Sequence, residues 1–193
     1  MNKGHYLSTI LRSDKTVFSF NDIALLWGES SPAARKRVSY YIKEGSLFRI
    51  RQGIYAKDSH YNKLEFASRV FTPSYVSFET VLGKAGITFQ FYGQIFVASY
   101  LTREIVCDKQ KYSFRKLKMT LLSDATGVEN KNNCAIATKE RAFLDILYVN
   151  KDYFFDNLSP LNWDKVFKVL PIYNNKRITK KVNGIYKNFN LKK

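Results

Sequence analysis

The sequence contains little cysteine and histidine, which limits the metal and catalytic sites that it can form. Its two cysteines, Cys107 and Cys134, lie far apart, with no CxxC motif and no nearby pair of histidines. We therefore expect two small buried side chains in a reducing cytosol, and neither a disulfide nor a zinc site. The two histidines, His5 and His60, have no serine, cysteine or aspartate partner at a recognisable spacing, so the pattern supports no catalytic triad and no metal site.

Long apolar runs are also missing. No stretch approaches the roughly 18 apolar residues that a membrane-spanning helix requires, and residues 1–14 mix charged with apolar side chains, which argues against a signal peptide. The segment 83–86 lacks the spacing of a phosphate-binding Walker loop, and no GxGxxG motif follows a strand. We expect a cytoplasmic protein that is not an enzyme and has no membrane partner and no cofactor.

Acidic residues are scarce relative to basic ones. Sixteen Asp and Glu stand against 32 Lys and Arg, giving a net charge of +16. A surface this positive attracts DNA, RNA, anionic lipid or an acidic protein. A general bias toward Lys and Asn codons produces the same charge without any partner. Only the placement of the charge along the chain can distinguish a binding surface from such a bias. The 45% hydrophobic content is ample for a buried core.

The first 58 residues predict three short helices followed by a hairpin. Apolar residues at helical spacing indicate a helix over residues 5–12. Ser19 or Asn21 can cap a second helix that Gly28 ends. A third helix begins at a Ser-Pro pair, with Pro32 in its first turn, and runs to about Glu44.

The third helix has two chemically different faces. At 100° per residue, Ala34, Val38, Tyr41 and Ile42 share one face, which suits a core. The opposite side carries small, basic and aromatic residues, with Arg37 and Ser39 on its flanks; these are Ala33, Lys36, Tyr40 and Lys43. That face suits an anion.

Two short strands follow, over residues 47–51 and 54–57, joined by Gln52 and Gly53. Arg49 and Arg51 alternate with apolar residues, so we expect both arginines on the same face of the hairpin. Three helices and a basic hairpin indicate a winged helix-turn-helix, whose third helix fits the major groove while the hairpin contacts an adjacent groove or phosphates. The candidate DNA-binding residues are Ser31, Ala33, Lys36, Arg37, Tyr40, Lys43, Arg49, Arg51 and Gln52.

Residues 61–193 predict a second, C-terminal α/β domain, so that the whole chain is of the mixed α+β class. We expect helices over 65–71, 75–83 and 139–148, and a helical tail over 163–189. Strands are expected over 94–99, 103–108, 112–116, 118–122 and 134–137, and a polar loop over 124–133. The boundary between the domains is placed at residues 58–61.

Most of the positive charge lies in this second part. Residues 1–60 carry ten Lys and Arg and five acids, whereas residues 61–193 carry 22 and eleven. Residues 165–193 hold nine Lys and Arg and no acid. The basic tail is therefore a candidate for a second nucleic-acid contact, with a simple solvated helix as the alternative; its candidate residues are Lys176, Arg177, Lys180 and Lys181.

Three short stretches resemble the AbiEi-type antitoxins of type IV toxin–antitoxin (abortive-infection) systems. RQGIY at 51–55 is similar to the R-x-G-x-Y wing of that family. PSYVSFETVL at 73–82, followed by Gly-Ile, is similar to its PSYISLESAL segment, and ATKERAFLDILY at 137–148 to its A-x-x-E-K-A-x-x-D-x-x-Y segment. Order and spacing agree up to about residue 150, and the last forty residues match nothing in the family.

The resemblance implies a repressor that binds inverted repeats in its own promoter, with a dimer on DNA as the expected form. It also implies an antitoxin that counteracts a nucleotidyltransferase-type toxin without forming a stable complex. Polar residues in the resembling stretches are interpreted as core or capping residues rather than functional ones; they are Tyr75, Glu79, Glu140 and Asp145.

Two other interpretations stay open. The winged helix and basic tail could dock an acidic protein or RNA instead of duplex DNA. A metal-dependent nuclease is the remaining enzymatic reading, since Asp124, Glu129 and Lys131 loosely suggest an acid–acid–lysine site for Mg²⁺. Because these three residues fall in an expected loop, whereas such ligands need rigid strands, we regard this reading as the weaker one.

Overall fold

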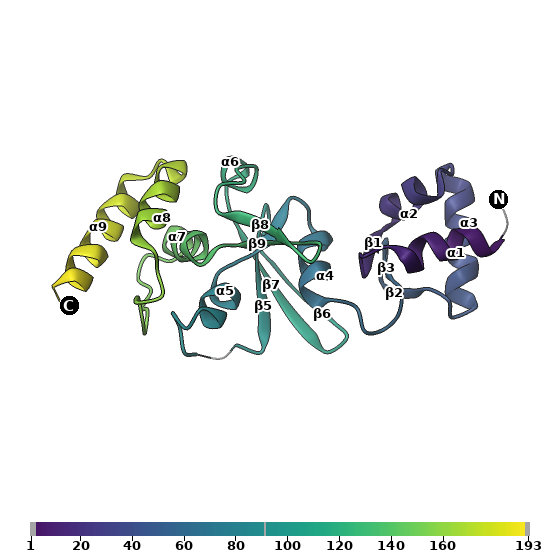
Figure 1. Cartoon of the computed structure of the whole chain (residues 1–193), viewed down its shortest axis with the longest axis horizontal. Coiled ribbons are helices and arrows are strands. Elements are labelled where there is room, and N and C mark those ends of the chain that lie inside the picture. The colour runs from purple at the N-terminus through teal and green to yellow at the C-terminus, as the bar shows by residue number, and fades with distance from the viewer. Residues whose placement is uncertain (1–2, 91, 192–193) are drawn as a thin grey trace.

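The computed structural model describes residues 3–90 and 92–191 and has the mixed α+β fold that the sequence predicts (Figure 1). Its first part consists of helices and a small sheet, in the chain order helix, strand, helix, helix, strand, strand. The sheet has three antiparallel strands in the order β1-β3-β2. The elements are α1 (Lys3–Arg12), β1 (Val17–Ser19), α2 (Phe20–Trp27), α3 (Ser31–Lys43), β2 (Phe48–Arg51) and β3 (Ile54–Ala56).

Local capping explains where α2 begins and ends. The Ser19 side chain accepts a hydrogen bond from the backbone of Asp22, whose carboxylate in turn accepts one from the backbone of Ser19. This reciprocal pair satisfies two amide groups that the helix itself leaves unpaired. Gly28 then ends the helix in the left-handed region, at φ 61°. The sequence predicted both ends of α2, but not the short strand β1 before it.

An apolar cluster holds the three N-terminal helices together. Trp27 and Tyr41 lie in it with their rings 6.0 Å apart, and the indole nitrogen of Trp27 donates to the backbone oxygen of Tyr6 at 2.9 Å. Because Ala34 and Val38 on α3 are also buried in this cluster, α3 is fixed with its other side toward solvent. The core face predicted for α3 is confirmed at these positions.

The second part is built on a six-stranded sheet in the order β6-β7-β5-β4-β9-β8. β5 and β7 run parallel, as do β4 and β9, and the remaining neighbours are antiparallel. The elements are α4 (Lys63–Val70), β4 (Ser74–Val76), α5 (Glu79–Lys84), β5 (Gln94–Ser99), β6 (Arg103–Cys107), β7 (Gln110–Lys116), α6 (Met119–Leu122), β8 (Val128–Lys131), β9 (Cys134–Ala137) and α7 (Lys139–Val149).

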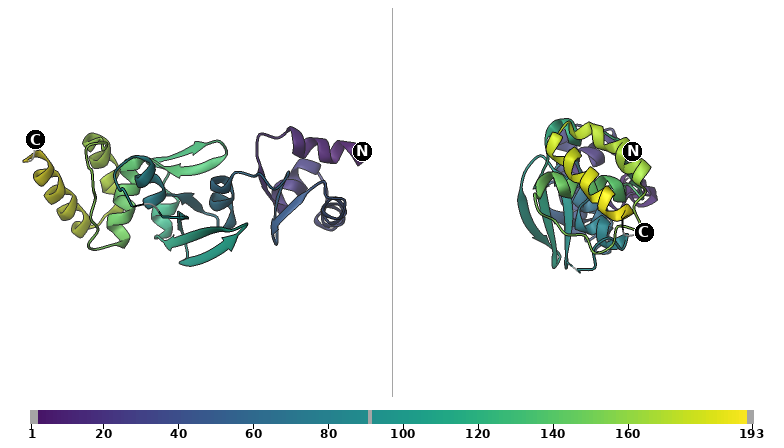
Figure 2. Two further views of the ribbon diagram at one scale, coloured as in Figure 1. Left: turned by 90° about the horizontal axis from the view of Figure 1, so that it is seen from below. Right: turned by 90° about the vertical axis from the view of Figure 1, so that its left-hand side faces the viewer.

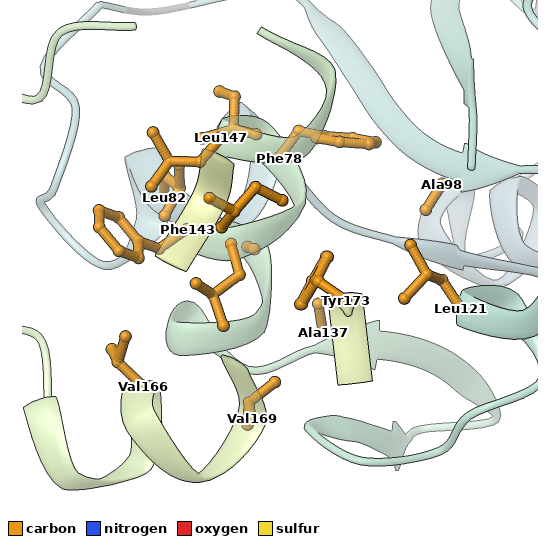
Figure 3. Packing of buried hydrophobic residues seen from close by; sticks show 14 of the residues in the cluster. Phe78, Leu82, Ala98, Leu121, Ala137, Phe143, Leu147, Val166, Val169 and Tyr173 are labelled. Carbon is orange, nitrogen blue, oxygen red and sulfur yellow. The ribbon is translucent and has the colours of Figure 1, made fainter. Parts of the chain in front are cut away.

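Three helical segments follow at the C-terminal end: α8 (Trp163–Val169), a 3-10 helix (Leu170–Tyr173) and α9 (Lys176–Asn190). α8 packs on α7, and the apolar side of α9 joins the same core through Ile178 and Val182. Figure 3 shows side chains of this core from α5, α7 and α8, among them Leu82, Phe143 and Val166. The expected single helical tail is therefore broken in two, because Asn174 takes the left-handed conformation at φ 41°.

Other expected elements were wrong in type. Residues 75–83 were predicted as one helix, but residues 74–76 form the central strand β4, and the helix begins only at Glu79. Residues 118–122 were predicted as a strand, but residues 119–122 form the helix α6. The segment 124–133, predicted to be a polar loop, contains the strand β8. In each case the segment is too short for apolar periodicity to distinguish helix from strand, and sheet pairing decides.

A buried ionic network ties α7 to the sheet. The carboxylate of Asp145 accepts hydrogen bonds from Tyr75 at 3.0 Å, Ser77 at 2.8 Å and Tyr173 at 2.6 Å, and forms an ion pair with Arg141 at 3.3 Å. Arg141 also donates to backbone oxygens of the α6 region, so that both charges are fully partnered. Burial and these contacts place Tyr75 and Asp145 in the core, as predicted.

The two parts of the chain share a packed junction. The buried carboxylate of Glu65, on α4, accepts hydrogen bonds from the backbone nitrogen of Thr16 at 2.9 Å and from its hydroxyl at 2.7 Å. Arg69 pairs with Glu65 at 3.2 Å and with Asp22, on α2, at 3.6 Å. Apolar residues of β1 and β3 also pack with Phe66. The molecule is elongated, with α3 and α9 toward its opposite ends (Figures 1 and 2).

Candidate nucleic-acid interface

α3 presents a solvent-exposed side that contains basic, hydroxyl and small residues. Ser31, Ala33, Lys36, Tyr40 and Lys43 are all exposed, as the helical periodicity predicts. Pro32 lies in the first turn after Ser30, which occupies the N-cap position without a side-chain hydrogen bond. Because α3 contains no acidic residue, every charged side chain on its exposed side is basic.

Arg37 lies differently from its neighbours. Its guanidinium donates to both carboxylate oxygens of Glu29, from Nε at 3.1 Å and from Nη2 at 2.6 Å. It also lies 3.7 Å above the centre of the Tyr6 ring. The hydrogen bond from Arg37 lowers the pKa of Glu29 below its usual range, so the carboxylate is ionised at neutral pH. Arg37 therefore joins α3 to the segment before it and to α1, and its guanidinium is engaged within the protein.

A shallow hollow of about 340 Å³ lies beside this contact, lined by Ala33, Lys36, Arg37, Tyr40 and Tyr41. Tyr40 stands at its edge with its hydroxyl directed to Glu44, and this hydrogen bond raises the pKa of Tyr40 above its usual value. An aromatic ring next to a lysine suits contact with a base edge or a thymine methyl group. Lys36 has no ion-pair partner among the residues that the structure describes.

The hairpin separates its two arginines. A β-bulge shifts the register between Arg49, which lies opposite Tyr55, and Arg51, which lies opposite Ile54. Paired residues on neighbouring strands point to the same face, and the two partners, Tyr55 and Ile54, are consecutive residues of β3 that point to opposite faces. The two arginines therefore point to opposite faces, and the prediction that they share a face was wrong. The extra residue in the strand is Ile50, and nothing in its sequence signals the bulge.

The burial of the two arginines follows from this register. Arg49 is exposed, whereas Arg51 is half-buried against the second part of the chain, 5.6 Å from the centre of the Phe71 ring. The Nη1 atom of Arg51 is buried and has no hydrogen-bond partner among the described residues. Gln52 is exposed at the turn, where Gly53 adopts φ 78°. The accessible polar groups of the hairpin are therefore those of Arg49 and Gln52.

Arg35 belongs to the same surface and was not among the sequence candidates. It is exposed on the N-terminal half of α3, and its guanidinium lies 5.4 Å from the centre of the Phe20 ring on α2. This contact directs the arginine along the side of the α2–α3 pair. The sequence did indicate Arg35 as a possible contact, because it lies beside Lys36 in a basic run. It was missed because the candidates were chosen from the residues directly opposite the apolar face of the helix.

The four candidates in the basic tail divide into two pairs. Lys176 and Lys180 are exposed and line a hollow of about 570 Å³. Arg177 instead donates to the backbone oxygens of Leu147 at 3.2 Å and Tyr148 at 2.9 Å, at the end of α7. Lys181 likewise contacts the backbone of Lys151, just beyond α7. Arg177 and Lys181 therefore stabilise the C-terminal end of α7.

The residues suggested for a nuclease site have other partners. The Asp124 carboxylate accepts a hydrogen bond from the backbone nitrogen of Thr126 at 2.8 Å, and hydrogen bonding to the side chain and then to the backbone of Thr126 lowers the pKa of Asp124. Glu129 and Lys131 lie on β8 and form an ion pair at 2.6 Å. Within residues 3–90 and 92–191, no group of three or more His, Cys, Asp or Glu side chains could hold a metal ion.

Within the same ranges, no helix has the length and apolarity needed to cross a membrane. Compared with models of known protein families and with curated proteins, the sequence has no match. The function is therefore inferred from the surface just described.

Proposed function

We propose that the protein is a DNA-binding transcriptional repressor that reads duplex DNA with α3. The observation that carries this proposal is the exposed side of α3, which is basic, free of acidic residues and held outward by a buried opposite side. An α-helix of this kind fits the major groove, where each base pair presents a distinct pattern of donors and acceptors.

The geometry supports separate roles for the exposed side chains. Lys36 and Tyr40, on the middle turns of α3, face base edges, and Arg35 and Lys43 flank them. Arg49 and Gln52 on the hairpin contact phosphates of the adjacent backbone, which adds affinity but no sequence information. Ser31 and Ala33 lie at the N-terminal end of the same side, where their small size permits close approach to the DNA.

The family resemblance extends this proposal to a biological setting. We propose that the protein binds inverted repeats in its own promoter, that two copies occupy these repeats, and that it acts in the cytoplasm. We also propose that it is the antitoxin of a type IV system and counteracts a nucleotidyltransferase-type toxin. The resemblance of residues 51–55, 73–82 and 137–148 to that family supports these points.

A gel-shift titration tests DNA binding. The full-length protein is titrated against its own upstream promoter and against random duplex of equal length, at several salt concentrations. We expect preferential binding to the promoter and a steep fall in affinity with salt, because each phosphate contact releases counterions. Equal affinity for both duplexes would contradict a sequence-specific repressor. Binding to RNA or to an acidic protein, without duplex binding, would indicate an interaction module instead.

Co-expression tests the antitoxin role separately. The chain is expressed together with the nucleotidyltransferase encoded beside it, and growth is compared with that of cells expressing the nucleotidyltransferase alone. Rescue is expected from the wild type. It is also expected from a Lys36→Ala, Tyr40→Ala variant when both genes have constitutive promoters, since repression then plays no part. If the neighbouring gene encodes no such protein, the antitoxin proposal fails while DNA binding stands.

A further inference from the structure

A cavity of about 500 Å³ lies at the carboxyl ends of two neighbouring parallel strands, β4 and β9. β4 is followed by α5, and β9 is followed by α7. The chain therefore passes from a strand into a helix at two places beside the cavity. Residues from each turn line it, including Val76 and Ala137 at the strand ends and Thr138 at the N-cap of α7. In open α/β sheets, small ligands bind at the carboxyl ends of the strands.

Lysines from three helices converge on this cavity. Lys84 comes from α5, Lys139 from the first turn of α7, and Lys165 from α8. None of the three forms an ion pair with another of the described residues. Bringing like charges together costs free energy that a bound anion offsets. Residues so distant in the sequence meet here only through the tertiary fold.

The acidic residues at the cavity already have partners. Glu129 pairs with Lys131 at 2.6 Å. Glu140 is buried, and its Oε1 atom accepts a hydrogen bond from the backbone nitrogen of Asn162 at 3.2 Å. With these carboxylates engaged, the three unpaired lysines set the local charge, and the cavity favours a negatively charged ligand.

The inner wall of the cavity is apolar. Leu64, Val76, Val81 and Ile136 contribute side chains from α4, β4, α5 and β9. An apolar wall beside a cationic rim accommodates a flat ring and a charged group in the same ligand. The volume also falls within the range of about 300–1,000 Å³ that is usual for small-molecule sites.

We propose that this cavity binds a nucleoside phosphate, with the phosphates held by Lys84, Lys139 and Lys165 and the base against the apolar wall. The site lies in the six-stranded part of the fold, and its existence does not depend on the proposed DNA binding.

Equilibrium dialysis with radiolabelled ATP, at physiological salt and with nucleic acid removed, tests the proposal on the full-length protein. One variant carries Lys84→Ala, Lys139→Ala and Lys165→Ala. A control of equal charge carries Lys116→Ala, Lys118→Ala and Lys187→Ala, which are exposed residues outside the cavity. We expect saturable binding whose Kd rises about tenfold or more in the cavity variant and stays within about twofold in the control.

Further ligands and a labelling step localise the interaction. Adenosine and pyrophosphate should each bind more weakly than ATP, because each occupies only one half of the site. Irradiation with azido-ATP should label peptides from 76–84 or 134–140. The proposal is overturned if binding is not saturable, if both variants lose affinity equally, or if pyrophosphate binds as tightly as ATP. The first two results indicate general charge attraction, and the third indicates a simple phosphate site.

Discussion

Arg37 donates to both carboxylate oxygens of Glu29 while its guanidinium lies against the ring of Tyr6. The pair connects the segment before α3 with the second turn of that helix and with α1. A bidentate contact of this kind fixes orientation as well as position. Arg37, which the sequence places on the flank of the candidate DNA-contacting side, therefore positions α3.

Substitutions at Arg37 and Lys36 should have different effects. We expect Arg37→Ala to lower the Tm by about 3 °C and to weaken binding to all duplexes. Arg37→Lys should not restore the Tm, because an ammonium group cannot hold two oxygens in this geometry. Lys36→Ala should leave the Tm unchanged and reduce discrimination between promoter and random duplex. Thermal melting and gel shifts on the three variants measure this. If Arg37→Ala kept its Tm but no longer discriminated between promoter and random duplex, Arg37 would instead be a residue that contacts bases.

The Glu29 carboxylate should contribute to the acid sensitivity of the fold. Its pKa is lowered in the folded chain by the hydrogen bond from Arg37, relative to about 4.3 in an unfolded chain. Its stabilising contribution is therefore complete above the unfolded pKa and is lost as the pH falls through the folded value. We expect Glu29→Gln to be less stable than the wild type at pH 7, the difference to shrink as the pH falls below about 4.3, and to vanish only once the pH is below the lowered folded pKa. A constant difference across melting curves from pH 3 to 7 would contradict this assignment.

The junction between the two parts of the chain depends on Glu65. Removing its buried carboxylate leaves the Thr16 donors without their acceptor and leaves Arg69 with Asp22 as its only ion-pair partner among the described residues, and we expect Glu65→Ala to cost about 3 kcal/mol. Thr16→Val removes only the hydroxyl and should cost about 1 kcal/mol. Glu104→Ala is the matched control, since Glu104 forms an exposed pair with Lys111, and its effect should stay below about 0.5 kcal/mol. Urea unfolding measures all three, and equal losses in Glu65→Ala and Glu104→Ala would refute a structural role for the junction.

Asp145 should matter for stability rather than for ligand binding. We expect Asp145→Ala to cost about 3–5 kcal/mol, because Arg141 is then buried without its counter-ion. Tyr173→Phe removes one hydrogen bond to the same carboxylate and should cost about 1 kcal/mol. Denaturant unfolding of both variants provides the measurement. A stable Asp145→Ala variant that fails in the co-expression test of the proposed antitoxin role, where the wild type rescues growth, would instead identify Asp145 as functional.

The basic tail should not contribute to the DNA binding proposed for α3. Lys176 and Lys180 lie on α9, toward the opposite end of the molecule from α3 (Figures 1 and 2). We expect their double replacement by alanine to leave both the affinity and its salt dependence unchanged. If both lysines contacted phosphates of the same DNA, the slope of log affinity against log salt would fall by about 1.8. Gel shifts at several salt concentrations distinguish these results.

Local chemistry made much of the N-terminal part predictable. The capping residues around α2, the Ser-Pro start of α3 and the glycine turn of the hairpin each act within a few residues, so their effect is visible in the sequence. The amphipathic pattern of α3 likewise determined which side is buried. These signals located the candidate interface before the fold was known.

Tertiary contacts decided the rest. The ion pair of Arg37 with Glu29, the bulge that turns Arg51 away from Arg49, and the meeting of Lys84, Lys139 and Lys165 all depend on segments brought together by packing. The strand β4 is similar, since its three residues become a strand only by pairing with β5 and β9. The sequence alone determined which side chains face solvent on a regular helix, because periodicity is local. Which of them remain free for a ligand was decided by the fold, because the competing partners lie elsewhere in the chain.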